Sequence, residues 1–520
     1  MNRLVVRTLS KNRLCILLHL PYQTKRFDRS SNETVEAFVN RIKSKLPTEV
    51  KTVALTDCRG TTVKKTVELC DALIPTNQFV CNDIVYEILV DPPTIESLKI
   101  PNTPVAGLAI SPTVKLIDLT LNDLTYTWET KAKDSDSWEQ ISTSEVLLLY
   151  QKLVGNVIRL SSKAVGVETV FSNVIGPVID DKDTNILLSR AVPIEYGYTR
   201  LMSYNILADV FMESKTKPIT NHFPYCSKKY QAREYREPRI VAEVWAHNPH
   251  LLCLQEVEDK TFSKYLVPML QSYQGHITVK KGRFKAGCAI FFKLDQYEEC
   301  QYESFPLPDL YQENSQMLDL IDLGNQMNSK FPETWRDISI RSIMSQIVVL
   351  KNKESKKLVI VGNTHLYWNP KYHIIALFHI HALCSKIQAV RKVYQKQGEG
   401  VSVVICGDMN SQTTSLVHAY LTDGVVSQVE NGDELQNFLH KNVRNPLKLT
   451  LARGEPNYTN YTADFKDVID YIVCDENSTV GHVTPSPNLS DLEESEGCPS
   501  AIFPSDHLPI ISDILLADTV

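Results

Sequence analysis

The sequence predicts a layered α/β domain in the second half of the chain, preceded by a β-rich α+β region. Two observations support this. Strand-like and helix-like runs alternate after about residue 199, whereas short β-like runs separated by turns fill the residues before it. A chain of 520 residues is too long for one core, so several domains are expected. We predict an N-terminal α+β module at 1–110, a β-sandwich module at 111–195 and the layered α/β domain at 196–520.

Composition limits the classes of protein to which the chain can belong. The formal net charge of −6 argues against wholesale electrostatic binding of long duplexes, although a local basic groove remains open. We see no run of 18 or more apolar residues, so no membrane partner is expected. The 12 cysteines form no CxxC pair, which gives no support to a zinc ribbon. No stable protein partner can be inferred.

The first half reads as short strands around one helix. Ser31–Lys45 has helical spacing, with Val35, Phe38, Val39 and Ile42 on one side. Turn-rich pieces such as Asp91-Pro92-Pro93 separate the strand-like runs, as in antiparallel sheets. These runs are Val50–Leu55, Asp83–Val90, Val114–Leu119, Val157–Leu160 and Thr169–Ile175.

In the second half, strands and helices alternate. We predict helices at Gln231–Ala246 and Ile374–Tyr394. Phe305–Arg341 reads as an insertion near the mouth of a site, with a helix at Tyr311–Gln326, and Ser486–Ser500 reads as a mobile loop. The predicted strands are Arg200–Tyr204, Leu251–Leu254, Ala286–Phe292, Leu358–Asn363, the strand at Val403, Val468–Val473 and Ile510–Leu515.

The run from Val403 to Ser411 combines a buried strand with two polar side chains at its end. Four apolar residues fit a strand covered on both faces, and Gly407 allows a sharp turn at its end. Asp408 and Asn410 then offer a carboxylate and an amide oxygen two residues apart, which suits a hard divalent cation. Taken alone, the run fits an ordinary Asx turn equally well.

Polar groups follow nearly every strand of this half. Taken one at a time, Glu256 reads as a surface acid, His365 as a satisfied core histidine and Asp506 as a turn residue. Six such strand ends in one domain favour a shared metal or phosphate site instead. The six are Tyr204-Asn205, Gln255-Glu256, Asn363-Thr364-His365, Gly407-Asp408-Met409-Asn410, Asp470-Tyr471 and Ser505-Asp506-His507.

These motifs, in this order, resemble the endonuclease/exonuclease/phosphatase superfamily from about Thr199 to the C-terminus. Ser203–Asp209, Phe223–Cys226, Leu254–Val257, Gly287–Lys293 and Tyr458–Thr462 are similar to its deadenylase branch. The resemblance implies a four-layered α/β sandwich and Mg²⁺-dependent phosphoester cleavage, with Mn²⁺ as the alternative ion. In that branch a phenylalanine commonly follows Tyr461-Thr462, whereas this chain has Ala463.

The resemblance also assigns roles. Glu256 and Asn205 would hold the metal, and Asp408 would orient and deprotonate water or share the metal. Asn410 would bind the phosphate or contribute to the metal site, and His507 and His365 would supply further donors. Asp470 or Asp506 would fix the tautomer of the histidine. Base-binding candidates near the motifs are Trp368, Asn460, Tyr461 and Phe465, although Tyr461 and Phe465 fit sheet packing equally well.

The expected activity is a Mg²⁺-dependent 3′–5′ exoribonuclease or phosphodiesterase. Its substrates would be 2′,5′-oligoadenylate and the 3′ ends of oligo- and poly(A) RNA, from which it would release AMP. Two alternatives remain open, a phosphatase of a dinucleotide or inositol phosphate and an inactive RNA-binding scaffold. No activated serine or cysteine accompanies the cluster, so direct in-line attack by water is expected.

The first residues bear on location. Arg3, Arg7, Arg13 and Arg26 precede the first acid, Asp28, a composition typical of a mitochondrial presequence. We therefore expect the mitochondrial matrix, with the cytoplasm as the alternative. Leu14–Leu20 fits an apolar first strand equally well.

Overall fold

The computed structural model describes residues 3–10, 12–20, 23–47, 50–212, 222–279, 285–426 and 433–517. The chain separates into two compact units. The first comprises Met1–Lys99, Thr113–Thr127 and Arg159–Asn173, and the second comprises Ile100–Pro112, Trp128–Ile158 and Val174–Val520. The division into modules at 1–110, 111–195 and 196–520 stays a prediction.

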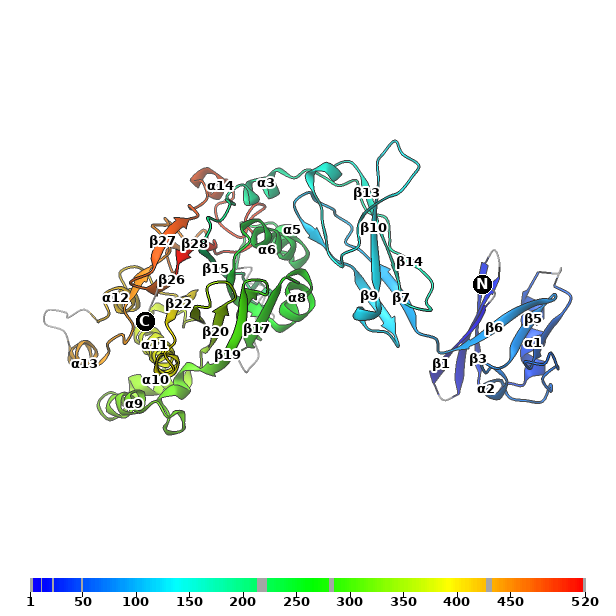
Figure 1. The fold of residues 1–520 in the computed structure, drawn as a ribbon, viewed down its shortest axis with the longest axis horizontal. Helices are drawn as coiled ribbons and strands as arrows, with labels where there is room; N and C mark the ends of the chain where they lie inside the picture. Colours follow the sequence, from blue (N-terminus) through cyan, green and yellow to red (C-terminus); the bar gives the residue numbers. More distant parts are fainter. Residues whose placement is uncertain are drawn as a thin grey trace. The chain divides into compact units, whose positions relative to one another are not determined.

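The first unit contains a six-stranded sheet of order β3-β2-β1-β6-β5-β4 (Figure 1). Strands β1 and β6 run parallel, and the other neighbours run antiparallel. The run Leu14–Leu20 forms most of β2, as the strand alternative predicts. The elements are β1 (Arg3–Ser10), β2 (Arg13–Leu20), β3 (Gln23–Ser30), α1 (Val35–Lys45), β4 (Val53–Thr56), α2 (Leu69–Ala72), β5 (Gln78–Cys81) and β6 (Ile84–Val90).

Helix α1 closes one face of this sheet. The Thr34 side chain accepts a hydrogen bond from the backbone N–H of Ala37, so the helix begins at Val35 rather than at Ser31. Its buried residues are Val35, Phe38 and Ile42, three of the four that helical spacing predicts. They pack with Leu4, Val6 and Ile16 of the sheet, among other residues, in one core.

Smaller sheets form between residues 94 and 171. Strand β7 pairs with β9, β8 pairs with β12, and four further strands have the order β11-β10-β13-β14. A short helix, α3 (Lys182–Leu188), follows, with Asp181 as its N-cap. The strands are β7 (Thr94–Lys99), β8 (Ala109–Ile110), β9 (Thr113–Ile117), β10 (Thr125–Lys131), β11 (Glu139–Ser142), β12 (Leu147–Leu148), β13 (Val157–Lys163) and β14 (Val170–Phe171).

The second unit contains two six-stranded sheets, of order β17-β18-β16-β15-β28-β27 and β19-β20-β21-β22-β26-β23. We call them sheet 1 and sheet 2. The strands of sheet 1 are β15 (Thr199–Asn205), β16 (Leu251–Glu258), β17 (Tyr273–Val279), β18 (Ala286–Lys293), β27 (Thr479–Val483) and β28 (Ile510–Leu515). The strands of sheet 2 are β19 (Tyr297–Pro306), β20 (Met344–Asn352), β21 (Leu358–His365), β22 (Val401–Asp408), β23 (Leu449–Leu451) and β26 (Asp470–Asp475).

The two sheets pack face to face with helices outside. One core joins their inner faces through residues such as Leu201, Cys253, Val348 and Val404. Helix α6 covers the outer face of sheet 1, and α11 with its neighbours covers that of sheet 2 (Figure 1). The predicted four-layered α/β sandwich is therefore confirmed. The helices are α4 (Asp209–Met212), α5 (Lys228–Gln231), α6 (Arg233–His247), α7 (Asp259–Thr261), α8 (Val267–Met269), α9 (Leu318–Lys330), α10 (Pro332–Ile340), α11 (His373–Lys396), α12 (Leu416–Thr422), α13 (Glu434–Asn442) and α14 (Leu489–Glu493).

Helix α11 is unusually long and apolar. By length and composition, the segment Pro370–Lys396 could cross a membrane, but 67% of its most apolar window is buried inside the protein. Its residues Leu377, Leu383 and Ile387 pack in the core beneath sheet 2. Burial of this kind is expected of a helix that covers a sheet.

Two segments differ from the prediction. In the insertion, residues 307–311 form a 3₁₀ turn and the helix begins only at Leu318, because Gln316 adopts a left-handed conformation (φ 62°). The segment Ser486–Ser500, predicted as a mobile loop, instead contains α14 and buries Leu492 and Cys498 in a core. Its polar composition did not reveal these two buried anchors.

Candidate active site

The topology explains why polar residues far apart in sequence meet. Strands β15 and β16 run parallel, as do β21 and β22, so their C-terminal ends carry Asn205, Glu256, His365 and Asp408 to one edge. Strand β26 is antiparallel to β22 and starts at this edge with Asp470, directly opposite Asp408. Strand β28 is antiparallel to β15 and begins opposite Ser203, so the segment before it, which contains His507, comes to the same edge.

Asn205 connects the two sheets at this edge. Its Nδ2 donates to Glu256 Oε1 at 3.2 Å and to Asp408 Oδ2 at 3.0 Å. Its Oδ1 accepts from the backbone N–H of Leu207 at 3.1 Å, which fixes the orientation of the amide. Glu256 lies on sheet 1 and Asp408 on sheet 2, so this one side chain sets the distance between the two carboxylates.

Glu256 stands in an unusual backbone position. Its φ is +58°, and the pairing of β16 with β18 slips between Leu254 and Val257, which marks a bulge. Such bulges redirect a side chain out of the regular alternation, often beside active sites. Glu256 Oε2 accepts from the backbone N–H of Ala208 at 3.0 Å.

The charge of Glu256 is poorly compensated by the protein. Burial and the neighbouring Asp506 raise the pKa of Glu256 to about 7. Burial also raises the pKa of Asp506, and Asp408 adds to this effect. Clustered carboxylates of this kind favour a bound cation, and oxygen ligands suit Mg²⁺ or Mn²⁺. The residues present therefore fit the metal that the family resemblance implies.

Asp408 is the most enclosed of these acids, at 1% exposed. Its Oδ1 accepts from the backbone N–H of Asn410 at 2.9 Å, and its Oδ2 accepts from Asn205. Two histidines approach the same oxygen: Nε2 of His365 lies 3.5 Å away and Nε2 of His507 lies 3.6 Å away. Amide N–H groups thus donate to both oxygens of the Asp408 carboxylate, and the two histidines approach Oδ2.

His507 forms a dyad with Asp470. Nδ1 of His507 lies 2.8 Å from Asp470 Oδ2, and the Thr459 hydroxyl accepts from the backbone N–H of Asp470 at 3.0 Å. Burial by itself would lower the pKa of His507, but Asp470, Asp408 and Asp506 together raise it well above the usual value. Asp470, rather than Asp506, is the carboxylate that orients the imidazole.

Asp408, Asp470 and His507 also offer ligand atoms within 4.8 Å of one another. Asp470 engages Nδ1 of His507, and Nε2 faces Asp408 Oδ2 at 3.6 Å, an arrangement that suits the transfer of a proton. We therefore interpret these three residues as an acid–base group and assign the metal site to the side of Glu256.

Asn410 has a structural contact in addition to its predicted role. Its Nδ2 donates to the backbone carbonyl of Leu366 at 3.0 Å, and its φ is +46°. One amide hydrogen is thus committed to the loop that follows β21. The second hydrogen and the carbonyl oxygen remain available for a phosphate or a metal.

The four predicted base-binding residues fall into different environments. Trp368 and Phe465 are 67% and 41% exposed. The backbone of Asn460 forms an isolated antiparallel β-bridge with that of His507. The buried side-chain Oδ1 of Asn460 has no hydrogen-bond partner among the described residues. The prediction that Tyr461 binds a base is wrong. This residue is 1% exposed and packs with Leu492 and Cys498 in a core, so its ring cannot stack on a base.

Residues that hold this edge together were not predicted. The hydroxyl of Ser505 donates to the backbone carbonyl of Asn205 at 2.7 Å. The guanidinium of Arg236 donates to the carbonyls of Ile206, Leu207 and Pro504. An arginine on a helix carries no sequence signal for such contacts, whereas Ser505 lies inside the strand-end motif.

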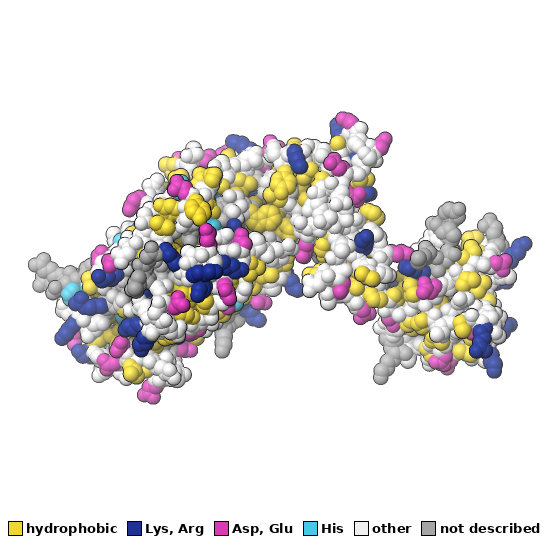
Figure 2. All heavy atoms as spheres, in the orientation of Figure 1, with side chains coloured by type: hydrophobic (Ala, Val, Ile, Leu, Met, Phe, Trp, Pro, Cys, Tyr) yellow, Lys and Arg dark blue, Asp and Glu magenta, His cyan; other side chains and the backbone are white. Residues whose placement is uncertain are grey.

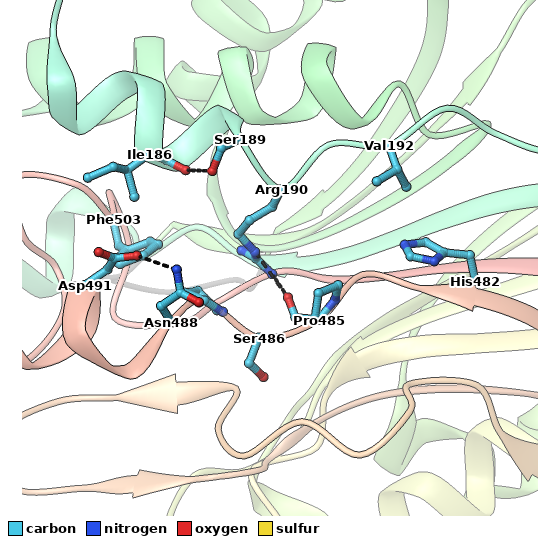
Figure 3. A pocket seen from close by; sticks show the side chains of 11 residues that line it. Ile186, Ser189, Arg190, Val192, His482, Pro485, Ser486, Asn488, Asp491 and Phe503 are labelled. Carbon is cyan, nitrogen blue, oxygen red and sulfur yellow. Dashed lines mark hydrogen bonds between the residues drawn. The ribbon is translucent and has the colours of Figure 1, made fainter.

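A cavity of about 340 Å³ lies elsewhere in the second unit (Figure 3). Its lining includes Arg190, His482 and Phe503 and none of the predicted site residues. Arg190 donates twice to the Pro485 carbonyl, and Asn488 donates to Asp491, so much of its polar lining is paired within the wall. This cavity is therefore not the candidate active site.

Comparison with known proteins gives a family match. The model of the endonuclease/exonuclease/phosphatase family matches residues 202–507. This range contains the strand ends described above, from Asn205 to His507.

Named relatives align with 62% to 83% of the chain. Human 2′,5′-phosphodiesterase 12 is 27% identical over 475 residues, which cover 83% of this chain and 75% of the relative. The CCR4-Not complex 3′-5′-exoribonuclease subunit Ccr4 of Candida albicans is 28% identical over 372 residues, which cover 66% of this chain and 44% of the relative. Among solved structures, that of ANGEL2, a 2′,3′-cyclic phosphatase, is 21% identical with a TM-score of 0.49, over 62% of this chain and 99% of that chain.

Proposed function

Because the chain belongs to the endonuclease/exonuclease/phosphatase family, we propose that it is a Mg²⁺-dependent 3′–5′ exoribonuclease and phosphodiesterase. The chain is a hydrolase of the phosphodiesterase and nuclease type, as its family and relatives indicate. Its proposed substrates are 2′,5′-oligoadenylate and the 3′ ends of oligo- and poly(A), from which it releases AMP. The names of the relatives support this choice.

One observation carries the proposal. The Asn205 amide joins Glu256 of one sheet to Asp408 of the other, and the His507–Asp470 dyad stands beside Asp408. Cleavage of a phosphodiester needs charge neutralisation, an activated water and a proton for the departing oxygen. This edge of the two sheets offers a group for each need.

Glu256 is the proposed anchor of the metal, with Asp408 and Asn410 as further oxygen ligands. Asn205, predicted as a ligand, presents its amide nitrogen to Glu256 and Asp408 and so positions these two carboxylates. A bound Mg²⁺ supplies neutralisation of the phosphate charge. The carboxylate of Asp408 orients the attacking water and accepts its proton. Asp408 is suited to this role because amide donors fix it in place.

The histidines act as donors. The imidazolium of His507, oriented by Asp470, donates to a phosphate oxygen as negative charge develops on it. His365, whose Nε2 lies 3.5 Å from the same oxygen of Asp408, supplies a second donor. Water attacks directly and in line, because no activated serine or cysteine nucleophile accompanies these residues in the part of the chain that the structure describes.

Substrate selection rests on stacking and on amide contacts. Asn460 offers a buried carbonyl oxygen without a partner among the described residues, which suits a donor on the terminal nucleotide. Phe465 and Trp368 present exposed rings. On the face shown in Figure 2, Lys and Arg side chains gather in places with Asp and Glu side chains beside them. The net charge of −6 agrees with recognition of a short strand end rather than a long duplex.

The proposal is tested by the product. Labelled 2′,5′-oligoadenylate and poly(A) are incubated with the protein in Mg²⁺ and in EDTA, and the products are separated. We expect AMP from both substrates with Mg²⁺ and none with EDTA. Release of inorganic phosphate from a dinucleotide or inositol phosphate without AMP from RNA would support the phosphatase alternative, and binding of RNA without any product would support the inactive scaffold.

A mitochondrial matrix location is part of the proposal. It rests on the basic, acid-poor composition before Asp28. Because these residues also form β1 and β2, import must leave them in place for the sheet to form. A reporter fused to residues 1–30 is expected to enter mitochondria, and a diffuse cytosolic signal from it and from the full chain would contradict this location.

A further inference from the structure

An exposed aromatic cluster stands beside the catalytic edge. Trp368 is 67% exposed, and it follows His365 by three residues in the loop after β21. Its ring lies 6.2 Å from that of Tyr367, which in turn contacts Tyr372 edge to face at 5.9 Å. We call Tyr367, Trp368 and Tyr372 the aromatic platform. An aromatic side chain this exposed gains little from packing, which points to a role in contact with another molecule.

An arginine from a distant segment holds the platform. The Arg341 guanidinium lies 4.3 Å from the ring centre of Tyr372 and 5.3 Å from that of Tyr367. Its Nη1 also donates to the carboxylate and the backbone carbonyl of Asp337. Arg341 follows α10, so the insertion Phe305–Arg341 ends against the loop that carries Trp368.

The same loop is tied to the catalytic strand. The backbone N–H of Leu366 donates to the carbonyl of Asp408 at 2.9 Å, and the Asn410 side chain donates to the carbonyl of Leu366 at 3.0 Å. Three residues span about 10 Å at most, so Trp368 lies within a few stacked bases of His365. The platform is therefore held at a fixed, short distance from Asp408.

The order of strands in sheet 2 places the aromatic platform on one side of Asp408. In sheet 2, β21 and β26 flank β22 on opposite sides, so the loop with Trp368 lies on one side of Asp408. Asp470, which faces Asp408 from β26, lies on the other side, with Asn460 bridged to His507. A single strand laid across Asp408 with its terminal nucleotide beside Asn460 would therefore extend toward the loop that carries Trp368.

We propose that the aromatic platform binds the base of the nucleotide next to the one released, by stacking on Trp368, and that Arg341 is the positioning residue of this subsite. The inference rests on the proposed exoribonuclease function. Stacking accepts any base, since every base has a π-face, so the platform favours a stacked single strand without reading its sequence.

The experiment compares two oligoadenylates of equal length. They differ only in the second-last residue, which carries adenine in one and no base in the other, so the terminal nucleotide and the bond cleaved are unchanged. We expect kcat/KM of the wild-type protein to be about tenfold higher on the complete substrate, within the range for stacking of one base. In Trp368→Ala the ratio should fall to about one.

Variants at Arg341 separate positioning from general structure. Arg341→Met should lose most of the discrimination, and Arg341→Lys, which keeps a cation for Tyr372, should retain part of it. Lys330→Met is the matched control, because Lys330 makes a similar cation–π contact with Phe438 from α9 of the same segment. This control should discriminate as the wild-type protein does.

The outcomes are distinguishable. Equal kcat/KM of the wild-type protein on both substrates, or full discrimination by Trp368→Ala, would overturn the platform while the AMP released upheld the proposed function. A loss of discrimination in Lys330→Met equal to that in Arg341→Met would overturn the assignment of Arg341. No AMP from either substrate would overturn the exoribonuclease function and the platform with it.

Discussion

Buried carboxylates in the second unit divide into two kinds by their partners. Asp513 is 1% exposed and accepts two hydrogen bonds from the Arg200 guanidinium, at 2.6 and 2.7 Å. Such a pair is neutral and closed to ligands. Asp408 is equally buried but is held by amide donors, and the pKa of Glu256 is raised to about 7 by burial and Asp506. Asp408 and Glu256, at the edge of the two sheets, have amide donors and a raised pKa where Asp513 has an arginine.

Glu237 on α6 provides a pH test outside the site. Burial raises the pKa of Glu237 from 4.5 to about 7, so folding favours its protonated form. The stability that this group contributes is present below about pH 4.5 and is lost as the pH rises through 7. Glu237→Gln keeps an acceptor for the Thr261 hydroxyl without the charge.

We therefore expect Glu237→Gln to be more stable than the wild-type protein at pH 8 by about 1 to 2 kcal/mol, below the roughly 3 kcal/mol of the full pKa difference. At pH 4.5 the advantage should largely vanish. Urea unfolding at the two pH values measures this, with the exposed Glu298→Gln on β19 as control. An equal difference at both pH values would contradict the account.

Asn205, Glu256 and Asp408 were predictable because each comes at the end of an apolar run, whereas Asp470 begins β26 and His507 precedes β28. The roles of these residues were only partly predictable. Tyr461 and Asn460 are adjacent and look alike as candidates, yet Tyr461 lies in a core and Asn460 keeps a buried oxygen without a described partner. The difference depends on the segment Ser486–Ser500, which covers Tyr461 through the Cys498 backbone. That long-range contact has no local sequence signal.

The pair of strands β21 and β22 is the element on which the site depends most. Their register places His365 beside Asp408 and Thr364 beside Gly407. A Cβ at Gly407 would lie 2.2 Å from the backbone oxygen of Thr364, and backbone cannot move aside cheaply. A side chain is therefore excluded where the two strands carry the site residues.

Gly407→Ala should force these strands apart next to Asp408. We expect a loss of about 2 to 4 kcal/mol in unfolding free energy, together with a fall in AMP release larger than the loss of folded protein explains. Gly362→Ala is the control in β21, since the one close contact of its Cβ, at 2.9 Å, is the Cδ1 end of the Ile387 side chain, which can rotate. If both variants lost stability and activity equally, the close strand contact at Gly407 would not be the cause.

At the scale of elements, periodicity predicted most helices and strands, and errors fell at their ends. The predicted helix Ser31–Lys45 begins instead at Val35, where Thr34 caps it. The helix expected at Tyr311–Gln326 begins at Leu318, after the left-handed Gln316. Apolar spacing reports which face is buried, whereas caps and turns decide where an element starts.

For the molecule as a whole, the described site residues lie between Asn205 and His507, whereas the first sheet has its own core. The turn Asp91-Pro92-Pro93 separates β6 from β7. Removing residues 1–91 should therefore leave kcat/KM on a dinucleotide within about threefold of that of the full chain. Loss of activity in a truncated chain that keeps its circular dichroism spectrum would show that the first sheet contributes to catalysis.

The convergence of six strand ends is a property of topology, which the sequence indicates only through the family resemblance. Parallel pairing of β15 with β16 and of β21 with β22, and the antiparallel return of β26, bring these ends to one edge. The side chains could be chosen one by one from the sequence. Their distances, such as 3.0 Å between Asn205 Nδ2 and Asp408 Oδ2, could not.

The central claim is that this edge is one catalytic centre. Its most direct test is the initial rate of AMP release from 2′,5′-oligoadenylate in Mg²⁺ by the wild-type protein, Glu256→Gln, Asp408→Asn and the control Glu298→Gln, with thermal unfolding of each. The account predicts that both site variants lose at least about 10²-fold in rate while remaining folded, and that the control does not. Folded Glu256→Gln and Asp408→Asn proteins that release AMP at the wild-type rate would contradict it.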